Sequence, residues 1–97
     1  MKTFEEIKGI LIQSKPIVQE KYQVKEMGIF GSYIRGEQNE DSDIDVLIDF
    51  EQSPSLLRFI ELENYFSDTT GVKVDLVIKR MLKPRIAKNV LAAVIYL

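Results

Sequence analysis

Hydrophobic positions along the chain follow two different periods. Three segments, 4–18, 54–71 and 84–97, carry apolar residues three to four positions apart, as one face of a helix does. Two others, 43–50 and 72–78, alternate apolar and polar positions as a half-buried strand does, and 24–30 ends in an apolar run. Helices and strands therefore alternate, which predicts an α/β fold with a small mixed β-sheet covered by helices.

The expected helices carry capping and breaking signals. Thr3 and Glu6 have the spacing of a capping box that opens the first helix, and Pro16 is expected to kink it. The second helix opens at Ser53-Pro54 and the third at Pro84. The side chains expected to face the core are Phe4, Ile7, Ile10, Leu11, Ile17, Val18, Leu56, Phe59, Ile60, Phe66, Ile86, Val90, Val94 and Leu97.

A glycine turn ends the first expected strand. Gly31-Ser32 follows residues 24–30, and glycine permits a tight turn whose backbone N–H groups can face an anion. A short helix is expected from Ser32 to about Gly36, with its positive N-terminal end beside the turn. This arrangement suits a triphosphate, and Arg35 offers either a phosphate contact or a brace for the loop. Gly31, Ser32 and Arg35 are therefore the candidate nucleotide-binding residues.

Two carboxylates share one face of the next strand. The period of two in residues 43–50 places Asp43 and Asp45 on the face opposite the apolar side chains. Side chains at i and i+2 converge on a common space, and oxygen ligands of this kind suit a hard divalent cation such as magnesium. The alternative is an exposed acidic strand face without chemistry.

A third acid, Asp75, stands in the alternating segment 72–78. Because apolar residues alternate along that segment and form one face, Asp75 lies on the opposite, polar face. If the two strands are neighbours, Asp75 reaches the space that Asp43 and Asp45 share. An acid in such an apolar strand is costly unless it is paired, metal-bound or hydrated, so the joint arrangement favours function. Asp43, Asp45 and Asp75 are the candidate catalytic residues and the candidate metal ligands.

The spacing of these motifs is specific. Gly31-Ser32, ten intervening residues and then Asp43-Ile44-Asp45 form a G-S-x10-D-x-D pattern, with Asp75 later in the chain. It resembles the minimal nucleotidyltransferases of the DNA polymerase beta-like superfamily, which are the antitoxins of HEPN/MNT toxin–antitoxin pairs. The resemblance covers nearly the whole chain. It implies a polymerase beta-like nucleotidyltransferase fold in one domain, 1–97, in which Asp43 and Asp45 hold metal ions and Asp75 assists activation of the attacking hydroxyl.

The same resemblance implies a reaction and a partner. The chain would be a protein adenylyltransferase that moves AMP from ATP to a tyrosine hydroxyl of a cognate HEPN RNase toxin and thereby acts as its antitoxin. Two magnesium ions, or manganese in their place, would polarise the attacking oxygen and neutralise the leaving pyrophosphate. Larger superfamily members carry an additional acceptor-binding domain, so we expect this chain's acceptor site to come largely from its partner. The alternatives are a non-catalytic binding module that neutralises a partner by steric contact and, more weakly, an antibiotic nucleotidyltransferase.

The composition of the chain excludes several kinds of site and several classes of partner. The 97 residues are enough for one domain with a modest core. The absence of cysteine and histidine excludes disulfides, thiol nucleophiles and the commonest general base, and leaves carboxylates as metal ligands. A net charge of −2 makes nucleic acid an unexpected partner. No stretch has the length of a membrane span and the N-terminus lacks the apolar core of a signal peptide, so we expect no membrane partner and a cytoplasmic location.

Basic side chains gather after the strand that carries Asp75, at Lys79, Arg80, Lys83, Arg85 and Lys88. A solvated helix start explains them about as well as a functional role does. As functional groups they would steer a triphosphate or dock an acidic partner surface. Because a helix N-terminus disfavours cations, the position of Arg85 leans slightly toward a ligand or partner role.

Overall fold

The computed structural model describes residues 3–36 and 43–97, apart from the side chains of Ser32 and Arg35. Most of the ten-residue spacer of the motif, including Asn39 to Ser42, lies outside the described residues. The helices are α1 (Phe4–Tyr22), α2 (Ser32–Arg35), α3 (Leu56–Thr70) and α4 (Pro84–Ala93), with a 3-10 turn η1 (Lys79–Met81). The strands are β1 (Val24–Phe30), β2 (Ile44–Phe50), β3 (Val74–Ile78) and β4 (Ile95–Tyr96).

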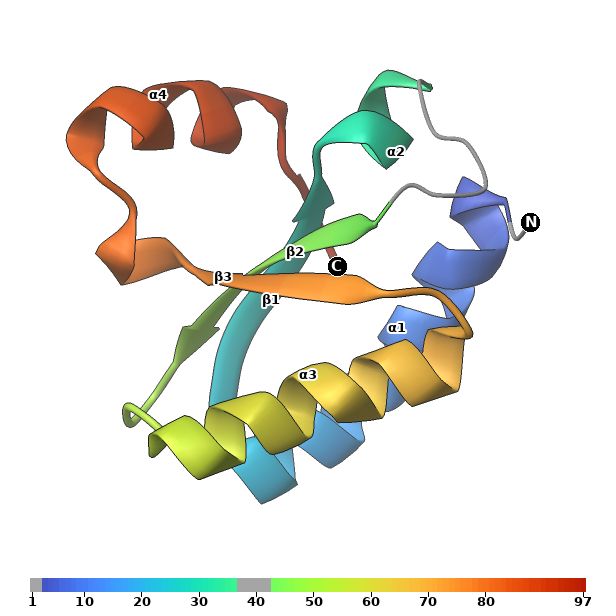
Figure 1. The fold of residues 1–97 in the computed structure, drawn as a ribbon, viewed down its shortest axis with the longest axis vertical. Helices are drawn as coiled ribbons and strands as arrows, with labels where there is room; N and C mark the ends of the chain where they lie inside the picture. Colours follow the sequence, from blue (N-terminus) through green and yellow to red (C-terminus); the bar gives the residue numbers. More distant parts are fainter. Residues whose placement is uncertain (1–2, 37–42) are drawn as a thin grey trace.

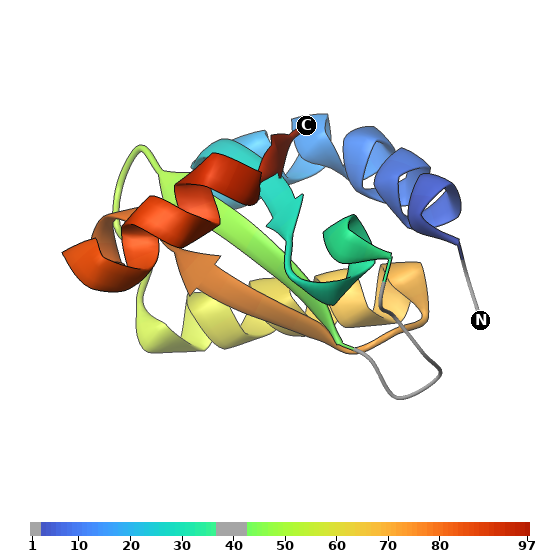
Figure 2. The ribbon, with the colours of Figure 1, turned by 90° about the horizontal axis from the view of Figure 1, so that it is seen from above.

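The four strands form one mixed sheet in the order β3-β2-β1-β4. β1 runs antiparallel to β2 and β4, whereas β2 and β3 are parallel. A parallel pair needs a crossover connection, which α3 supplies. Figures 1 and 2 show α1 and α3 together on one side of the strands and α4 on the other. The predicted α/β fold with a small mixed sheet is thus confirmed.

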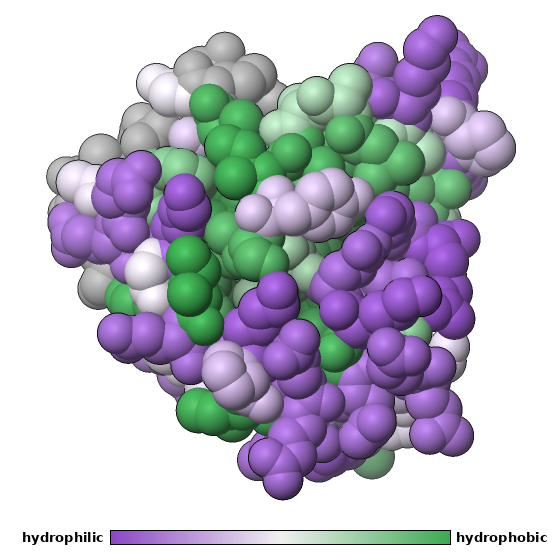
Figure 3. Space-filling model, turned by 180° about the vertical axis from the view of Figure 1, so that it is seen from behind, coloured by the Kyte–Doolittle hydropathy of each residue, from purple (hydrophilic) through white to green (hydrophobic). Residues whose placement is uncertain are grey.

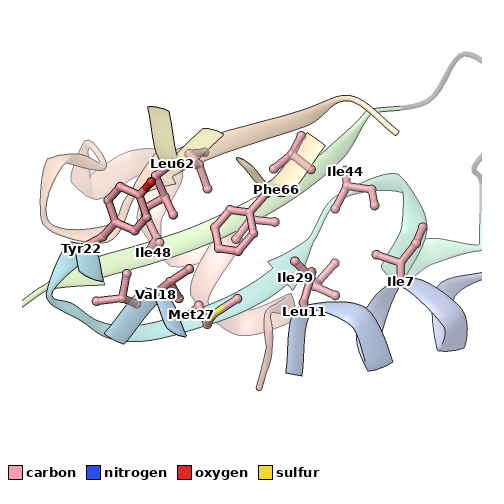
Figure 4. Packing of buried hydrophobic residues seen from close by; sticks show 14 of the residues in the cluster. Ile7, Leu11, Val18, Tyr22, Met27, Ile29, Ile44, Ile48, Leu62 and Phe66 are labelled. Atoms are coloured by element: carbon pink, nitrogen blue, oxygen red, sulfur yellow. The ribbon is translucent and has the colours of Figure 1, made fainter. Parts of the chain in front are cut away.

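The core lies between the sheet and the pair α1 and α3, which contact each other and the strands (Figure 4). Apolar side chains from β1 and β2 meet one stripe from each helix. The fully buried members include Ile7, Leu11, Val18, Met27, Ile29, Ile44, Ile48, Leu62 and Phe66. The N–H groups of β3 that point away from β2 are also satisfied, because Val74 donates to Ser67 Oγ at 3.0 Å and Leu76 donates to Glu63 Oε2 at 3.0 Å. These bonds protect one edge of the sheet.

Several side chains expected in the core are exposed instead. Ile17 is 52% exposed, and α3 turns its stripe of Leu62, Phe66 and Thr70 inward, so the flanking Leu56 and Ile60 face outward. The prediction for α4 was wrong for a different reason. None of its ten residues, all of which the structure describes, is buried, and Ile86 is 52% exposed. In Figure 3 hydrophobic side chains gather at the surface over α4 and β4, because α4 does not pack on the core.

The ends of the helices confirm part of the capping prediction. Thr3 and Glu6 form the expected capping box, and Pro16 lies inside α1. Ser55, and not Ser53, caps α3, because its hydroxyl accepts the N–H of Arg58 at 3.2 Å. No described helix combines the length and the apolar character needed to cross a membrane.

The short strand β4 was not predicted. It adds to the edge of β1 at a close approach, where a Cβ on Gly28 would lie 2.7 Å from Val94 Cγ2 and 2.9 Å from the carbonyl oxygen of Ile95. Two further bonds hold the residue after it, since Leu97 N–H donates to the Met27 carbonyl at 3.0 Å and Lys15 Nζ donates to the Leu97 carbonyl at 2.6 Å. The C-terminal segment therefore pairs with the sheet. As a result α4, which directly precedes this segment, crosses the sheet.

Candidate active site

The parallel pairing of β2 and β3 brings the candidate acids together. Asp45 and Asp75 are register partners, and the Ile44 N–H bonds to the Lys73 carbonyl at 2.9 Å, which extends the pairing to the start of β2 beside Asp43. Because the neighbours Ile44, Val46, Val74 and Leu76 are buried on the core side, the three acids occupy the opposite face. The strands are neighbours, as the predicted juxtaposition of the acids requires, and the catalytic role of these residues stays a prediction.

The acids interact unfavourably with one another. Burial raises the pKa of Asp75, and the negative charge of Asp43 and a hydrogen bond between the two carboxyl groups raise this pKa further. Lys73 opposes that shift, and it lies 3.7 Å from Asp43 in an ion pair whose lysine is largely exposed. Such an exposed pair is weak. A divalent cation would relieve the repulsion between these carboxylates far more than Lys73 does.

The glycine turn lies directly against Asp45. Gly31 has a φ of +87°, which L side chains rarely adopt, and a Cβ added there would overlap the Asp45 carboxylate. The turn closes with a bond from the Ile34 N–H to the Gly31 carbonyl at 3.1 Å and leads into α2. Ser32 and Arg35 begin and end α2, but their side chains lie outside the described part of the chain. The turn and the acids therefore belong to one site.

A hollow of about 270 Å³ opens in front of this turn. Its lining residues are Phe30, Gly31, Asp45, Asn89, Val90 and Ala93. One wall therefore comes from the glycine turn and the acidic strand, and the other comes from α4. The hydrophobic pattern predicted that α4 packs against the core, and Asn89 was not among the candidate site residues. The available signal was a polar residue beside Val90 in an otherwise apolar helical stripe.

Two cations of the basic cluster attach η1, the segment that leads into α4, to the sheet. Arg80 donates to Asp49 Oδ1 at 2.8 Å and to the Phe50 carbonyl at 2.6 Å, and Lys79 pairs with Glu26 beneath the ring of Tyr96. The hydrogen bond to Glu26, and then that to Tyr96, raises the pKa of Lys79. Burial by itself would raise the pKa of Asp49, but the hydrogen bond with Arg80 and the neighbouring charges outweigh it and lower this pKa overall.

The rest of the basic cluster is differently placed. Lys83, Arg85 and Lys88 are exposed and form no ion pair with any residue in 3–36 or 43–97. In contrast to these three residues, Lys79 and Arg80 are structural, because they attach η1 to β1 and β2. Lys83, Arg85 and Lys88 remain available to a ligand or a partner.

The side-chain atoms at the hollow that could ligate a metal ion are carboxylate and amide oxygens. Within the described ranges no three acidic side chains already stand in a metal-binding arrangement. The negative charge of Asp43 raises the pKa of Asp75, so these two carboxyl groups lie close enough to repel each other. With Asp45 at the next position on the same face, the set has the oxygen chemistry that suits a hard divalent cation rather than a soft one.

A mixed sheet with carboxylates on neighbouring strands, beside a glycine turn and a helix start, is the arrangement expected of a nucleotidyltransferase. The comparison with protein families agrees with this class. The chain belongs to the nucleotidyltransferase domain family, whose model matches residues 11–97.

Relatives and solved structures resemble the chain over nearly its full length. A protein of Thermococcus cleftensis named protein adenylyltransferase MntA is 55% identical over 96 residues, which cover 99% of this chain and 97% of the relative. A solved structure described as a candidate minimal nucleotidyltransferase has a TM-score of 0.76 at 32% identity and covers 94% of this chain and 95% of its own. A tri-AMPylated Shewanella oneidensis HEPN toxin in complex with its MNT antitoxin matches at a TM-score of 0.62 and 18% identity, covers 90% of this chain and 70% of its own, and shows the shared fold.

Proposed function

We propose that this protein is a metal-dependent protein adenylyltransferase, which moves AMP from ATP to a hydroxyl group on a partner protein. The observation that carries the proposal is the contact of the Gly31 turn with Asp45, whose register partner on the next strand is Asp75. A phosphate-binding turn and a carboxylate cluster are thereby combined in one site. The 55% identity to a relative named protein adenylyltransferase supports the same reaction.

Each candidate residue has a role in this reaction. The backbone of the Gly31 turn, with Ser32 and Arg35, would hold the triphosphate. Asp43 and Asp45, with Asp75 beside them, would hold magnesium or manganese, which when bound neutralises charge on the phosphates. The acceptor oxygen attacks the α-phosphorus, the bond from this phosphorus to the pyrophosphate oxygen breaks, and pyrophosphate leaves. Asp75 takes the hydroxyl proton, a role that its raised pKa favours.

The acceptor protein is expected to be a HEPN toxin, and the transfer would silence it in the cytoplasm. The family resemblance carries this assignment, and the toxin–antitoxin complex with the same fold supports it. The hollow of about 270 Å³ would take one nucleoside, and because Asp43 and Asp75 are not among its lining residues, a second protein would approach them from outside it. We therefore expect ATP alone to be turned over poorly, because the partner supplies the hydroxyl.

The decisive experiment mixes this protein, magnesium, ATP and the product of the neighbouring gene and then measures the intact mass of that partner. A gain of one or more AMP units is the expected result. The Asp45→Asn variant is the matched control and should leave the mass unchanged. The proposal is contradicted if the partner is silenced in a tight complex without a gain of mass and Asp45→Asn silences it equally well, since that outcome establishes a steric binding module.

A further inference from the structure

The helix α4 has an apolar side with no core beneath it. Asn89, Val90 and Ala93 line the hollow in front of Asp45, and Ile86 lies one turn earlier on the same side. None of the ten residues of this fully described helix is buried. An amphipathic helix normally buries such a stripe, so a flat apolar group is the natural occupant of this one.

We propose that α4 is the wall that binds the nucleobase and that Asn89 reads its edge. This inference rests on the proposed function, because it takes the Gly31 turn and Asp45 as the phosphate end of the site. The nucleoside then extends from the α-phosphate into the hollow. There Val90 and Ala93 supply apolar contact, and the Asn89 amide is the uncharged polar group of the wall.

The chemistry of the amide favours adenine. An asparagine side chain offers one donor and one acceptor side by side, which match the N7 acceptor and the N6 donor of adenine. Guanine presents two acceptors, O6 and N7, on the corresponding edge, so the same amide makes one hydrogen bond and leaves its carbonyl unpaired. The unpaired carbonyl adds to the discrimination once the bound base covers it, because a polar atom shielded from water without a partner is costly.

Contacts at both ends of α4 hold this wall in place. Arg80 joins η1 to Asp49 and Phe50, and Lys79 joins it to Glu26. β4 fixes the other end of α4 by pairing with β1 at Gly28. Because both ends of α4 are attached to the sheet that carries Asp45, the distance between the phosphate end and the base wall is set by the fold.

The test measures equilibrium binding of ATP, GTP and inorganic tripolyphosphate to the full chain with magnesium. The parent protein should bind ATP more tightly than GTP. Asn89→Ala should weaken ATP binding by roughly 5-fold to 150-fold and bring ATP and GTP close to equal affinity, which is the effect of losing one bidentate contact of about 1–3 kcal/mol. Tripolyphosphate binding should stay within about twofold, which also reports that the variant is folded. Leu91→Ala, an uncharged and 40% exposed position on the opposite side of α4, is the matched control and should change none of the three affinities.

Two outcomes would overturn the inference. Unchanged ATP affinity in Asn89→Ala would show that α4 does not contact the base, and an equal loss for ATP and GTP would show a contact to the ribose or a structural role. Failure of the proposed function looks different, because the parent protein would then bind no nucleotide or would bind it without transferring AMP to a partner. Neither of those results depends on Asn89.

Discussion

The two faces of the sheet differ in burial and in charge. The face under α1 and α3 is sealed by side chains with no exposure, such as Ile44, Leu62 and Phe66. The opposite face carries Asp43, Asp45 and Asp75 and is spanned by α4, a helix that buries none of its described residues. One strand serves both faces, since β2 turns Ile44, Val46, Ile48 and Phe50 to the sealed face and Asp45, Leu47 and Asp49 to the other.

This difference separates stability from chemistry in a chain of 97 residues. The sealed face supplies the burial that holds the sheet together, so the open face can keep repelling carboxylates close to one another. Substitutions on the first face should therefore change folding and leave the site's design intact. Substitutions of Asp43, Asp45 and Asp75 on the second face should change transfer and leave folding intact.

The largest effect is expected at the acids of β2. Asp43→Asn and Asp45→Asn should each lower the rate of AMP transfer by at least about a thousandfold, or about 4 kcal/mol, because each removes a charge that holds the metal. Asp43→Asn should also leave the melting temperature unchanged or slightly higher, since it relieves repulsion with Asp75. The measurements are the initial rate of mass gain on the partner and a thermal melt. Transfer that persists in a chelator at the parent rate would contradict the metal-dependent mechanism.

Phe66→Ala tests the sealed face. It should lower the free energy of unfolding by about 3–5 kcal/mol, because it empties a fully buried site between α3 and the sheet. Leu57→Ala, on the same helix but 79% exposed, is the matched control and should change stability by less than about 0.5 kcal/mol. Chemical denaturation measures both. Similar losses in the two variants would show that α3 does not seal the core in the way described.

Asp75→Asn should separate binding from chemistry. If Asp75 accepts the hydroxyl proton, the variant should bind magnesium and ATP nearly as the parent does and transfer AMP about a hundredfold more slowly. Nucleotide titration and single-turnover transfer measure the two properties. An affinity loss equal to that of Asp43→Asn and Asp45→Asn would instead make Asp75 a ligand of the metal and nucleotide. Loss of folding would make its role structural.

Arg85 and Lys88, which form no ion pair with the described residues, should affect docking alone. We expect Arg85→Ala with Lys88→Ala to weaken binding of the partner protein up to about tenfold, because charge complementarity near the hollow would be lost. ATP affinity should not change. Lys8→Ala, on α1 at the sealed side, is the control for a general loss of positive charge. A fall in ATP affinity without a change in partner binding would assign these cations to the triphosphate.

The smallest effect concerns Asp49, a carboxylate that shares the polar face of β2 with Asp45 but is structural. Its pKa in the folded protein lies below the ordinary value of 3.8, because Arg80, the Phe50 backbone and Lys25 outweigh the effect of burial. The unfolded chain therefore binds more protons near this pH, and the stabilisation is present above about pH 3.8 and is lost as the pH falls through the lowered pKa. Asp49→Asn should cost about 1 kcal/mol at pH 7 and less at pH 3, as measured by denaturation at both pH values. An equal cost at both would show that the carboxylate charge does not stabilise the fold.

Much of the fold could be read from local signals. The capping box at Thr3, the turn at Gly31 and the alternation in β2 each depend on a few adjacent residues, and each was predicted correctly. The exposure of Leu56, Ile60 and Ile86 could not be read in this way, because an apolar stripe does not state what it will face. β4 escaped prediction because a two-residue strand has no period of its own and depends on the space above Gly28.

The sequence by itself determined the chemistry of this protein, namely which acids exist, which side of each strand they occupy and which glycine precedes the short helix. These properties follow from residue types and from the period of two, which any strand must obey. Only the tertiary structure decided that β2 and β3 are parallel neighbours, that Asp45 lies against Gly31 and that α4 closes the hollow with Asn89. These contacts join residues far apart in the chain, and they are set by how the sheet and helices pack, which local sequence does not encode.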